Sequence, residues 1–409
     1  MTLDLERLGG LAWTQLWQAT RRYWLIAGML FLLAATGAEL RLAALSTIAG
    51  EHRKEPAGES SSQKARKKPD RAASASGNKL KRERDTDAAA EKPAQQDSEA
   101  APAQAAIRLA IDRGVAYLKT QQKDDGMWRD PPGYPGGLTA LSSLALLESG
   151  VPVADDAVQR SLAQLRKLKP ETTYVAALAT LVLCAAEPER DRRQIERQAE
   201  WLAEKQRKRA GETTGAWSYP HPYSQTEVDN SNTGFALLAL YEADRVGIHI
   251  EKDVWRRALG YWRSAQNPNG SWGYKPSTPG SGSMTCQGLA CVAAACNVLD
   301  QHEANQSGPQ AIERASQWLG RNFSVHVNPG AGPKLWRAYY LHALARAGRL
   351  AKRREFGDHD WYAEGAKALL EAQSMPGGFW KFDGHAESDP VIGTSLALLF
   401  LARGVEADD

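Results

Sequence analysis

The sequence predicts an all-α protein in which six outer helices alternate with six inner helices around a central cavity. Two observations lead to this prediction. Amphipathic segments alternate six times with segments that are apolar on nearly every side, as helices buried on both faces must be. A Gln–Gly–Trp ending also recurs after several of the amphipathic segments. Six pairs close most simply into a double ring. An open solenoid is the alternative, but it needs polar terminal repeats, and the last inner segment, 394–404, is apolar.

The helices of each pair are recognised by their apolar pattern. In the first outer segment, Ile107, Ile111, Val115 and Leu118 recur at helical spacing. The outer helices are expected near 104–122, 155–168, 189–208, 251–266, 309–323 and 362–373. The inner helices, rich in Ala and Leu, are expected at 138–149, 174–186, 233–243, 285–299, 335–348 and 394–404.

The repeated endings lie at 117–128, 261–272 and 369–380, with weaker copies at 201–217 and 315–323. Each full copy has a Gln, a short turn that contains Gly, and a Trp. The glycines suit turns in which φ is positive. The Trp is expected to fold back as an apolar plug, and the Gln amide to bond open backbone groups near the helix end.

The N-terminal segment, 1–50, contains a nearly uncharged apolar run that follows Arg21 and Arg22. We interpret about 23–46 as a single membrane-anchoring helix, with a cleaved signal peptide as the alternative. The anchor would make this a single-pass membrane protein with its helical domain on the extracytoplasmic side. Residues 51–103 contain one large aliphatic residue, Leu80, and many charges, so they are expected to form a disordered linker. The helical domain is expected to span 104–405.

Charge and cysteine content exclude several classes of function. Residues 101–409 hold 35 basic and 35 acidic residues, so nucleic-acid binding is not expected there. The four cysteines form no Cys-x-x-Cys pair, which argues against a zinc cluster. Asp358-His359-Asp360 permits either a metal site or a helix N-cap with a Trp packed behind it, and the cap is favoured. We expect no metal and no cofactor, and the sequence does not identify a protein partner.

The repeated endings resemble the QW repeats of squalene–hopene cyclases and other class II terpenoid cyclases, and the related prenyltransferase repeat. The resemblance covers roughly 104–405. It implies an (α/α)6 toroid, the fold that these cyclases share with protein prenyltransferase β subunits and complement-like thioester domains. Fold alone does not imply function, so the chemistry of each family has to be compared with the residues.

The cyclases that this sequence resembles start their reaction with an Asp-x-Asp-Asp-Thr motif. The matching stretch here is Asp229-Asn230-Ser231-Asn232-Thr233, so the residue at the proton-donor position is Ser231. A serine hydroxyl is too weak an acid to protonate an alkene. Prenyltransferases bind zinc through Asp-x-Cys, but Met284 stands where that Asp would be. Toroid glycosidases need two carboxylates, for which the candidates are Asp229, Asp389, Asp358 and Asp360.

The segments before the inner helices are rich in polar and aromatic residues and should meet at one mouth of the ring. The candidate ligand-binding residues are Tyr134, Trp217, Tyr219, His221, Ser231, Asn232, Cys286, Trp336, Tyr340 and Thr394. The six helix N-termini are expected to add open N–H groups and partial positive charge there. For Asp229 and Asp389, an N-cap is the alternative to a catalytic role.

Three functional hypotheses follow. The first is a membrane-anchored toroid without the cyclase acid motif that binds an isoprenoid, a lipid or a peptide in its cavity. The second is an enzyme, either a terpenoid or isoprenoid transferase or lyase or a carbohydrate-active enzyme, that uses Asp229 and Asp389. The third is a structural scaffold that presents its outer face to partners.

Overall fold

The computed structural model describes residues 92–219, 228–300, 302, 308–332, 335–384 and 386–402, with side chains described from 103 onward. All of them belong to one compact unit, Asp85–Asp409. The predicted anchor at 23–46 and most of the predicted linker lie outside the described residues. Within the described ranges, every helix is too short or too polar to cross a membrane.

The described residues form six outer and six inner helices in strict alternation. The outer helices are α2 (Lys92–Thr120), α4 (Asp156–Leu165), α6 (Pro188–Lys205), α8 (Lys252–Ser264), α11 (Gly308–Arg321) and α13 (Trp361–Ala372). The inner helices are α3 (Gly137–Glu148), α5 (Thr173–Ala186), α7 (Asn230–Arg245), α9 (Gly282–Val298), α12 (Arg337–Leu350) and α14 (Pro390–Leu401). A small antiparallel hairpin pairs β1 (Glu355–Phe356) with β2 (His359–Asp360). The helices confirm the all-α prediction, and α2 begins at Lys92, ahead of the expected start near 104.

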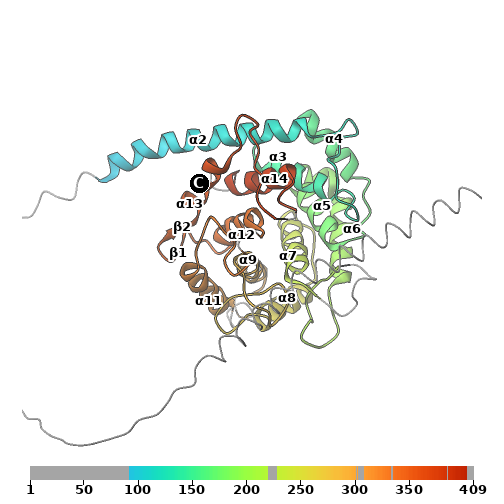
Figure 1. Ribbon diagram of the computed structural model, residues 1–409. Helices are drawn as coiled ribbons and strands as arrows, with labels where there is room; N and C mark the ends of the chain where they lie inside the picture. The colour runs from blue at the N-terminus through green and yellow to red at the C-terminus, as the bar shows by residue number, and fades with distance from the viewer. Residues whose placement is uncertain are drawn as a thin grey trace, which may run out of the picture. The chain divides into compact units, whose positions relative to one another are not determined.

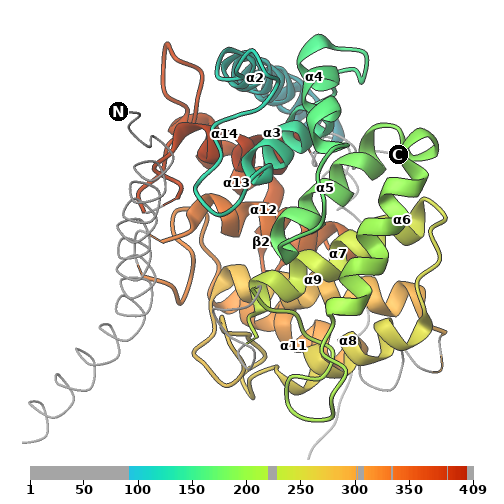
Figure 2. The same cartoon turned by 90° about the vertical axis from the view of Figure 1, so that its right-hand side faces the viewer.

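The inner helices form a closed ring. Each one contacts the next along the chain, and α14 contacts α3, so the last pair returns to the first. The hydroxyl oxygens of Ser142 on α3 and Ser395 on α14 lie 3.2 Å apart in a hydrogen bond at this closure. Figure 1 shows the outer helices surrounding the inner ones, and Figure 2 shows the same ring turned by 90°. The closed double ring is thus observed, and the open solenoid is excluded.

The tryptophans of the repeated endings are buried plugs, as predicted. Trp272 is fully buried, and its Nε1–H donates to the carbonyl oxygen of Trp262 near the end of α8 at 2.8 Å. Its backbone N–H donates to the Oγ1 of Thr285 on the following inner helix at 3.2 Å. Three other tryptophans, Trp128, Trp217 and Trp380, make the same two bonds. Each indole N–H donates to a carbonyl oxygen of the preceding outer helix, and each backbone N–H donates to a Thr of the following inner helix, namely Thr139, Thr233 and Thr394. Each plug therefore joins an outer helix to the inner helix that follows.

The glutamines of these endings bind successive repeats together. The Gln266 side-chain amide donates to the carbonyl oxygen of Gly270 in its own turn and to that of Ala311 on the next outer helix. Gln122, Gln206 and Gln373 make the equivalent pairs of bonds. For Gln373 the second acceptor is Ala110 on α2, at 3.0 Å, so this residue closes the outer ring.

The turn glycines have the predicted positive φ. Gly270 has a φ of 94°, and a Cβ there would collide with the carbonyl oxygen of Arg314 on α11. Only glycine allows both this backbone conformation and this close approach of the next outer helix. The turn chemistry therefore sets the spacing between repeats.

Candidate functional site

Asp229 is a buried carboxylate at the start of α7. Its Oδ1 accepts a hydrogen bond from the backbone N–H of Asn232 at 2.8 Å, and its Oδ2 accepts one from the Asn232 side-chain amide at 2.9 Å. Asp229 is only 3% exposed. Burial raises its pKa to about 6, although the bonds from Asn232 and Ser231 and the charge of Lys275 act in the opposite direction. Both oxygens of this carboxylate are thus engaged in capping.

Ser231 faces the interior of the ring. Its hydroxyl lies 3.2 Å from the phenol oxygen of Tyr339 on α12, in a hydrogen bond. The Tyr339 ring also stacks on Phe235 of α7, with the ring centroids 6.1 Å apart. Because α9 lies between α7 and α12 in the ring order, these contacts cross the interior. Aromatic side chains of α7 and α12 therefore meet near the N-termini of these two helices.

Five tyrosines gather at this end of the ring and are called the tyrosine mouth below: Tyr134, Tyr174, Tyr219, Tyr274 and Tyr339. The Tyr219 and Tyr274 hydroxyls lie 3.3 Å apart, and Tyr174 packs on Phe235. Burial raises the pKa of Tyr339 to about 12. Burial and the charge of Asp229 raise the pKa of Tyr219 and of Tyr274. The mouth combines aromatic faces with neutral hydroxyl groups that can donate or accept hydrogen bonds.

A buried cation lies deeper in the ring. The Arg346 guanidinium of α12 stands over the Phe235 ring, 5.2 Å from its centroid, and contacts the Nε2 of His342 one turn earlier. Arg346 is 5% exposed and His342 is 1% exposed. Both residues were missed by the sequence reasoning. The available signal was their spacing, because Tyr339, His342 and Arg346 recur at helical spacing on an otherwise apolar inner helix.

Comparisons with known proteins bear on the fold of this ring. The family model of the squalene-hopene cyclase C-terminal domain matches residues 171–287, the stretch that contains Asp229 and Ser231. A type II terpene cyclase from Scytonema superimposes with a TM-score of 0.51 and 16% identity, over 73% of this chain and 99% of that chain.

The fold is therefore that of the type II terpene cyclases, and the match to the squalene-hopene cyclase family model is confined to residues 171–287.

Carbohydrate-active proteins share the same architecture. A family 76 glycoside hydrolase from a Bacteroides thetaiotaomicron strain aligns with a TM-score of 0.52 and 9% identity, over 72% of this chain and 77% of that chain. A sugar epimerase from a ruminal bacterium aligns with a TM-score of 0.51 and 12% identity, over 74% and 99%. These identities are low, so the likeness concerns the fold. No curated protein matches the sequence.

Four predicted ligand-binding residues lie in the core of the toroid. Trp217 and Thr394 belong to the plug network, where Thr394 accepts from the Trp380 backbone N–H at 3.0 Å. Cys286 and Tyr340 are fully buried, and burial raises the pKa of each side chain well above its usual value. The sequence placed these residues correctly near inner-helix starts, but their side chains pack into the protein rather than into the mouth.

The other predicted ligand-binding residues differ in their surroundings. Tyr134 and Tyr219 belong to the tyrosine mouth, and Trp336 packs edge-on against Tyr339, with ring centroids 6.3 Å apart. Asn232 is used by Asp229. His221 lies outside the described residues.

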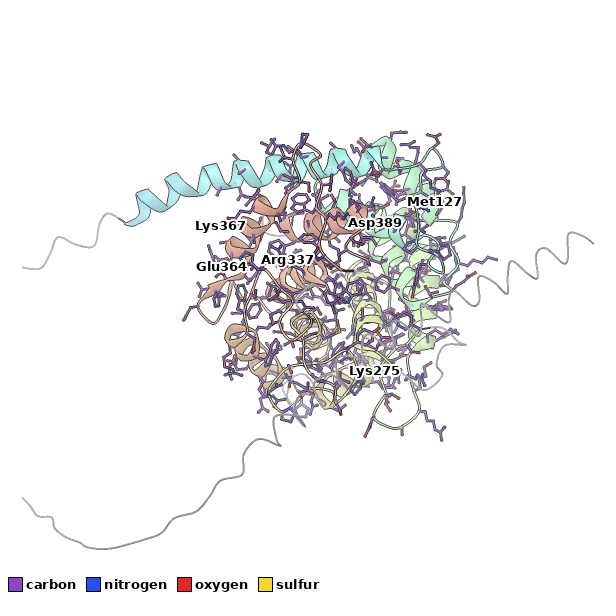
Figure 3. The ribbon with its side chains drawn as sticks, in the orientation of Figure 1. Met127, Lys275, Arg337, Glu364, Lys367 and Asp389 are labelled. Atoms are coloured by element: carbon purple, nitrogen blue, oxygen red, sulfur yellow. The ribbon has the colours of Figure 1, made fainter. Side chains whose placement is uncertain are left out.

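Asp389 lies in surroundings of its own. It is exposed and caps α14, where its Oδ1 accepts from the Val391 N–H at 2.8 Å. It lines a separate hollow of about 350 Å³ with Tyr117 and Arg129, among others. Figure 3 shows Asp389 on a different part of the ring from Lys275, whose charge acts on Asp229. Asp229 and Asp389 thus cap two different inner helices, α7 and α14.

The inner-helix N-termini are capped, so the expectation of open N–H groups is wrong for the bonded positions. Asp130 accepts from the N–H groups of Gly136 and Leu138 at the start of α3, each at 2.8 Å. Glu387 accepts from Tyr339 at 2.7 Å and from Ala338 at 3.1 Å at the start of α12. The remaining caps are Thr172 on α5, Asp229 on α7, Ser281 on α9 and Asp389 on α14.

Asp358-His359-Asp360 forms the predicted cap. Asp360 accepts from the N–H groups of Tyr362 and Ala363 at the start of α13, and the buried Trp361 packs behind it. His359 stacks on Phe323. A hollow of about 920 Å³ beside this hairpin is lined by charged residues of α11 and of the segment after α12. Among the described residues, no group of His, Cys, Asp and Glu is arranged to hold a metal ion.

Proposed function

We propose that this toroid binds an apolar ligand of isoprenoid or lipid type, or a peptide, at the tyrosine mouth without starting a cyclisation by protonating an alkene. One observation supports this most directly. The hydroxyl of Ser231, at the proton-donor position of the cyclase motif, is bonded to Tyr339. Both oxygens of the nearby Asp229 carboxylate are bonded to Asn232.

The chemistry of protonation supports the same proposal. Alkene protonation needs a strong carboxylic acid whose conjugate base is stabilised by its neighbours. Burial acts on Asp229 in the opposite sense, because it raises the pKa to about 6 and makes the group a weaker acid. The aromatic faces of the mouth offer an apolar chain a packing surface, and the hydroxyls can bind a polar head group.

Incubation with squalene tests the catalytic half of the proposal. We expect wild type to form no cyclic hydrocarbon, and the double variant Ser231→Asp with Asn232→Asp restores the acidic motif for comparison. Cyclisation by wild type would overturn the proposal. Native mass spectrometry after gentle extraction tests the binding half, since a retained lipid-sized mass supports binding and its absence favours a scaffold.

An enzyme that acts on a carbohydrate is the second candidate. The supporting observation is the pKa of Asp229, which at about 6 suits a general acid or base near neutral pH. The partner carboxylate expected from the sequence is Asp389, which caps α14. A screen with glycosides tests this candidate. The expected signature is turnover that is abolished in Asp229→Asn and that depends on pH near 6.

We also propose that the segment 23–46 anchors the chain in a membrane, with the toroid on the extracytoplasmic side. The support is the apolar run after Arg21 and Arg22. The full chain should remain in the membrane fraction after alkaline carbonate washing, whereas residues 101–409 alone should be released. A mature N-terminus between residues 35 and 50 would instead establish a cleaved signal.

A further inference from the structure

The hollow that Asp389 lines lies where the ring closes, and it is called the seam hollow below. It has a volume of about 350 Å³, within the range of about 300–1,000 Å³ that is usual for small-molecule sites. Tyr117 comes from α2, Arg129 from the segment between α2 and α3, and Leu138 from α3. Asp389 and Val391 come from the start of α14, which contacts both α2 and α3 (Figure 1). A ligand in the seam hollow would therefore touch the first and the last repeat together.

Two opposite charges share the seam hollow without pairing. The Arg129 guanidinium and the Asp389 carboxylate both line it, yet they form no ion pair with each other or with any other residue that the structure describes. One carboxylate oxygen of Asp389 accepts from the Val391 N–H, and the other has no hydrogen-bond partner in the described part of the chain. The seam hollow thus offers a ligand one positive and one negative anchor.

The rest of the lining combines a phenol with apolar surface. The Tyr117 ring packs against Phe379, with the ring centroids 5.0 Å apart, and its hydroxyl makes no hydrogen bond within the described ranges. Burial and then the charge of Asp389 raise the pKa of Tyr117, so the phenol and the carboxylate lie within electrostatic reach of each other. Leu138 and Val391 add apolar surface. A few polar groups that converge over an apolar wall are typical of a small-molecule site.

We propose that the seam hollow binds a small zwitterion of the amino-acid type, whose carboxylate pairs with Arg129 and whose ammonium group pairs with Asp389. A guanidinium forms charge-assisted hydrogen bonds with a carboxylate. The second oxygen of Asp389 and the Tyr117 hydroxyl can accept from an ammonium group, which has three donors. A ligand with a single charge would use one anchor and leave the other to water, so the zwitterion is favoured. This inference goes beyond the proposed function and does not depend on the tyrosine mouth.

Calorimetric titration of the full chain in detergent tests the two anchors with three probes that share one side chain. Leucine carries both charges, isocaproate lacks the ammonium group, and isoamylamine lacks the carboxylate. We expect leucine to bind about tenfold more tightly than either analogue, because each analogue loses the bonds to one charged group. An analogue that binds as well as leucine would overturn the two-anchor assignment. So would binding of glucose without leucine, or a failure of glycine, leucine and phenylalanine alike to bind, and either result would leave the proposed function standing.

Two variants assign each anchor to its residue. Arg129→Gln should abolish the preference for leucine over isoamylamine, since neither probe's binding then gains from a guanidinium. Asp389→Asn should abolish the preference for leucine over isocaproate, and the fold should tolerate it because Asn caps a helix about as well as Asp. Arg108→Gln and Asp112→Asn are the matched controls, since this ion pair on α2 has side chains that are 57% and 59% exposed, and both preferences should persist in them. Preferences that change equally in the controls would show that only net charge matters, and would overturn the site.

Discussion

The Ser231 hydroxyl and the Tyr339 phenol lie 3.2 Å apart and join α7 to α12 across the interior of the ring. The resemblance to the cyclase motif implies that Ser231 occupies the proton-donor position, and its hydroxyl is here part of a neutral hydrogen bond. The partner comes from 108 residues further along the chain. The contact therefore depends on how the inner helices pack around the ring.

Tyr339→Phe removes one partner of this bond. We expect a loss of about 0.5–1.5 kcal/mol in the free energy of unfolding, the usual net value of one hydrogen bond. Urea unfolding of Tyr339→Phe, Ser231→Ala and the double variant measures the coupling between the two groups. Tyr241→Phe, on the same helix as Ser231 but with its hydroxyl near the exposed Asn297, serves as the control and should change little. Additive effects of the two mouth variants would contradict the bond.

Trp272→Ala empties a fully buried plug site. The expected loss is about 3–5 kcal/mol, because the cavity that remains cannot be filled by neighbouring groups held in the plug network. Thermal or chemical unfolding measures it. Trp201→Ala removes a partly exposed tryptophan of the outer helix α6 and should be clearly milder. An unchanged stability of Trp272→Ala would contradict the plug role.

Gln373→Ala opens the outer ring at its closure. The change leaves the carbonyl oxygens of Ala110 and Gly378 without this donor, and we expect a loss of about 1–3 kcal/mol in the free energy of unfolding. The exposed Gln317 of α11 provides the control, since Gln317→Ala breaks only a bond to Glu313 on its own helix. An equal loss of stability in the two variants would show that the bonds of Gln373 stabilise the fold no more than a bond within one helix does.

Asp229 should give the stability a pH dependence of known sign. Its folded pKa of about 6 lies above the usual value of an unfolded Asp, so the native state binds the extra proton between these pH values. The stability that this group contributes is therefore full below about pH 4 and is lost as the pH rises to about 6. The free energy of unfolding of wild type minus that of Asp229→Asn should change by about 3 kcal/mol between the two ends of this pH range.

The exposed Asp253 of α8 gives the matched control for this experiment, because Asp253→Asn should not introduce the same pH dependence. If the difference in free energy of unfolding between wild type and Asp229→Asn stays constant from about pH 4 to about pH 7, Asp229 titrates at its ordinary pKa. Burial of the capping carboxylate would then not raise its pKa.

The helical architecture could be predicted from the sequence because its causes are local and repeated. The apolar pattern, the turn glycines and the Gln and Trp of each ending act within one repeat or between adjacent ones. Trp272 is a buried plug and the Gln266 amide bonds the backbone of its turn, as their spacing suggested. The cap at Asp360 follows from the same local chemistry.

The candidate site required the tertiary structure because its partners come from distant repeats. A sequence can place Ser231 and Thr394 at helix starts, but the rotation of each inner helix decides which side chain faces the interior. Packing turns Ser231 toward Tyr339 and Thr394 toward Trp380. Glu387 caps α12 from the loop before α14, 48 residues after Tyr339. The sequence thus determined the repeat and its turns, while the packing of the inner helices around the ring decided which distant side chains share the mouth.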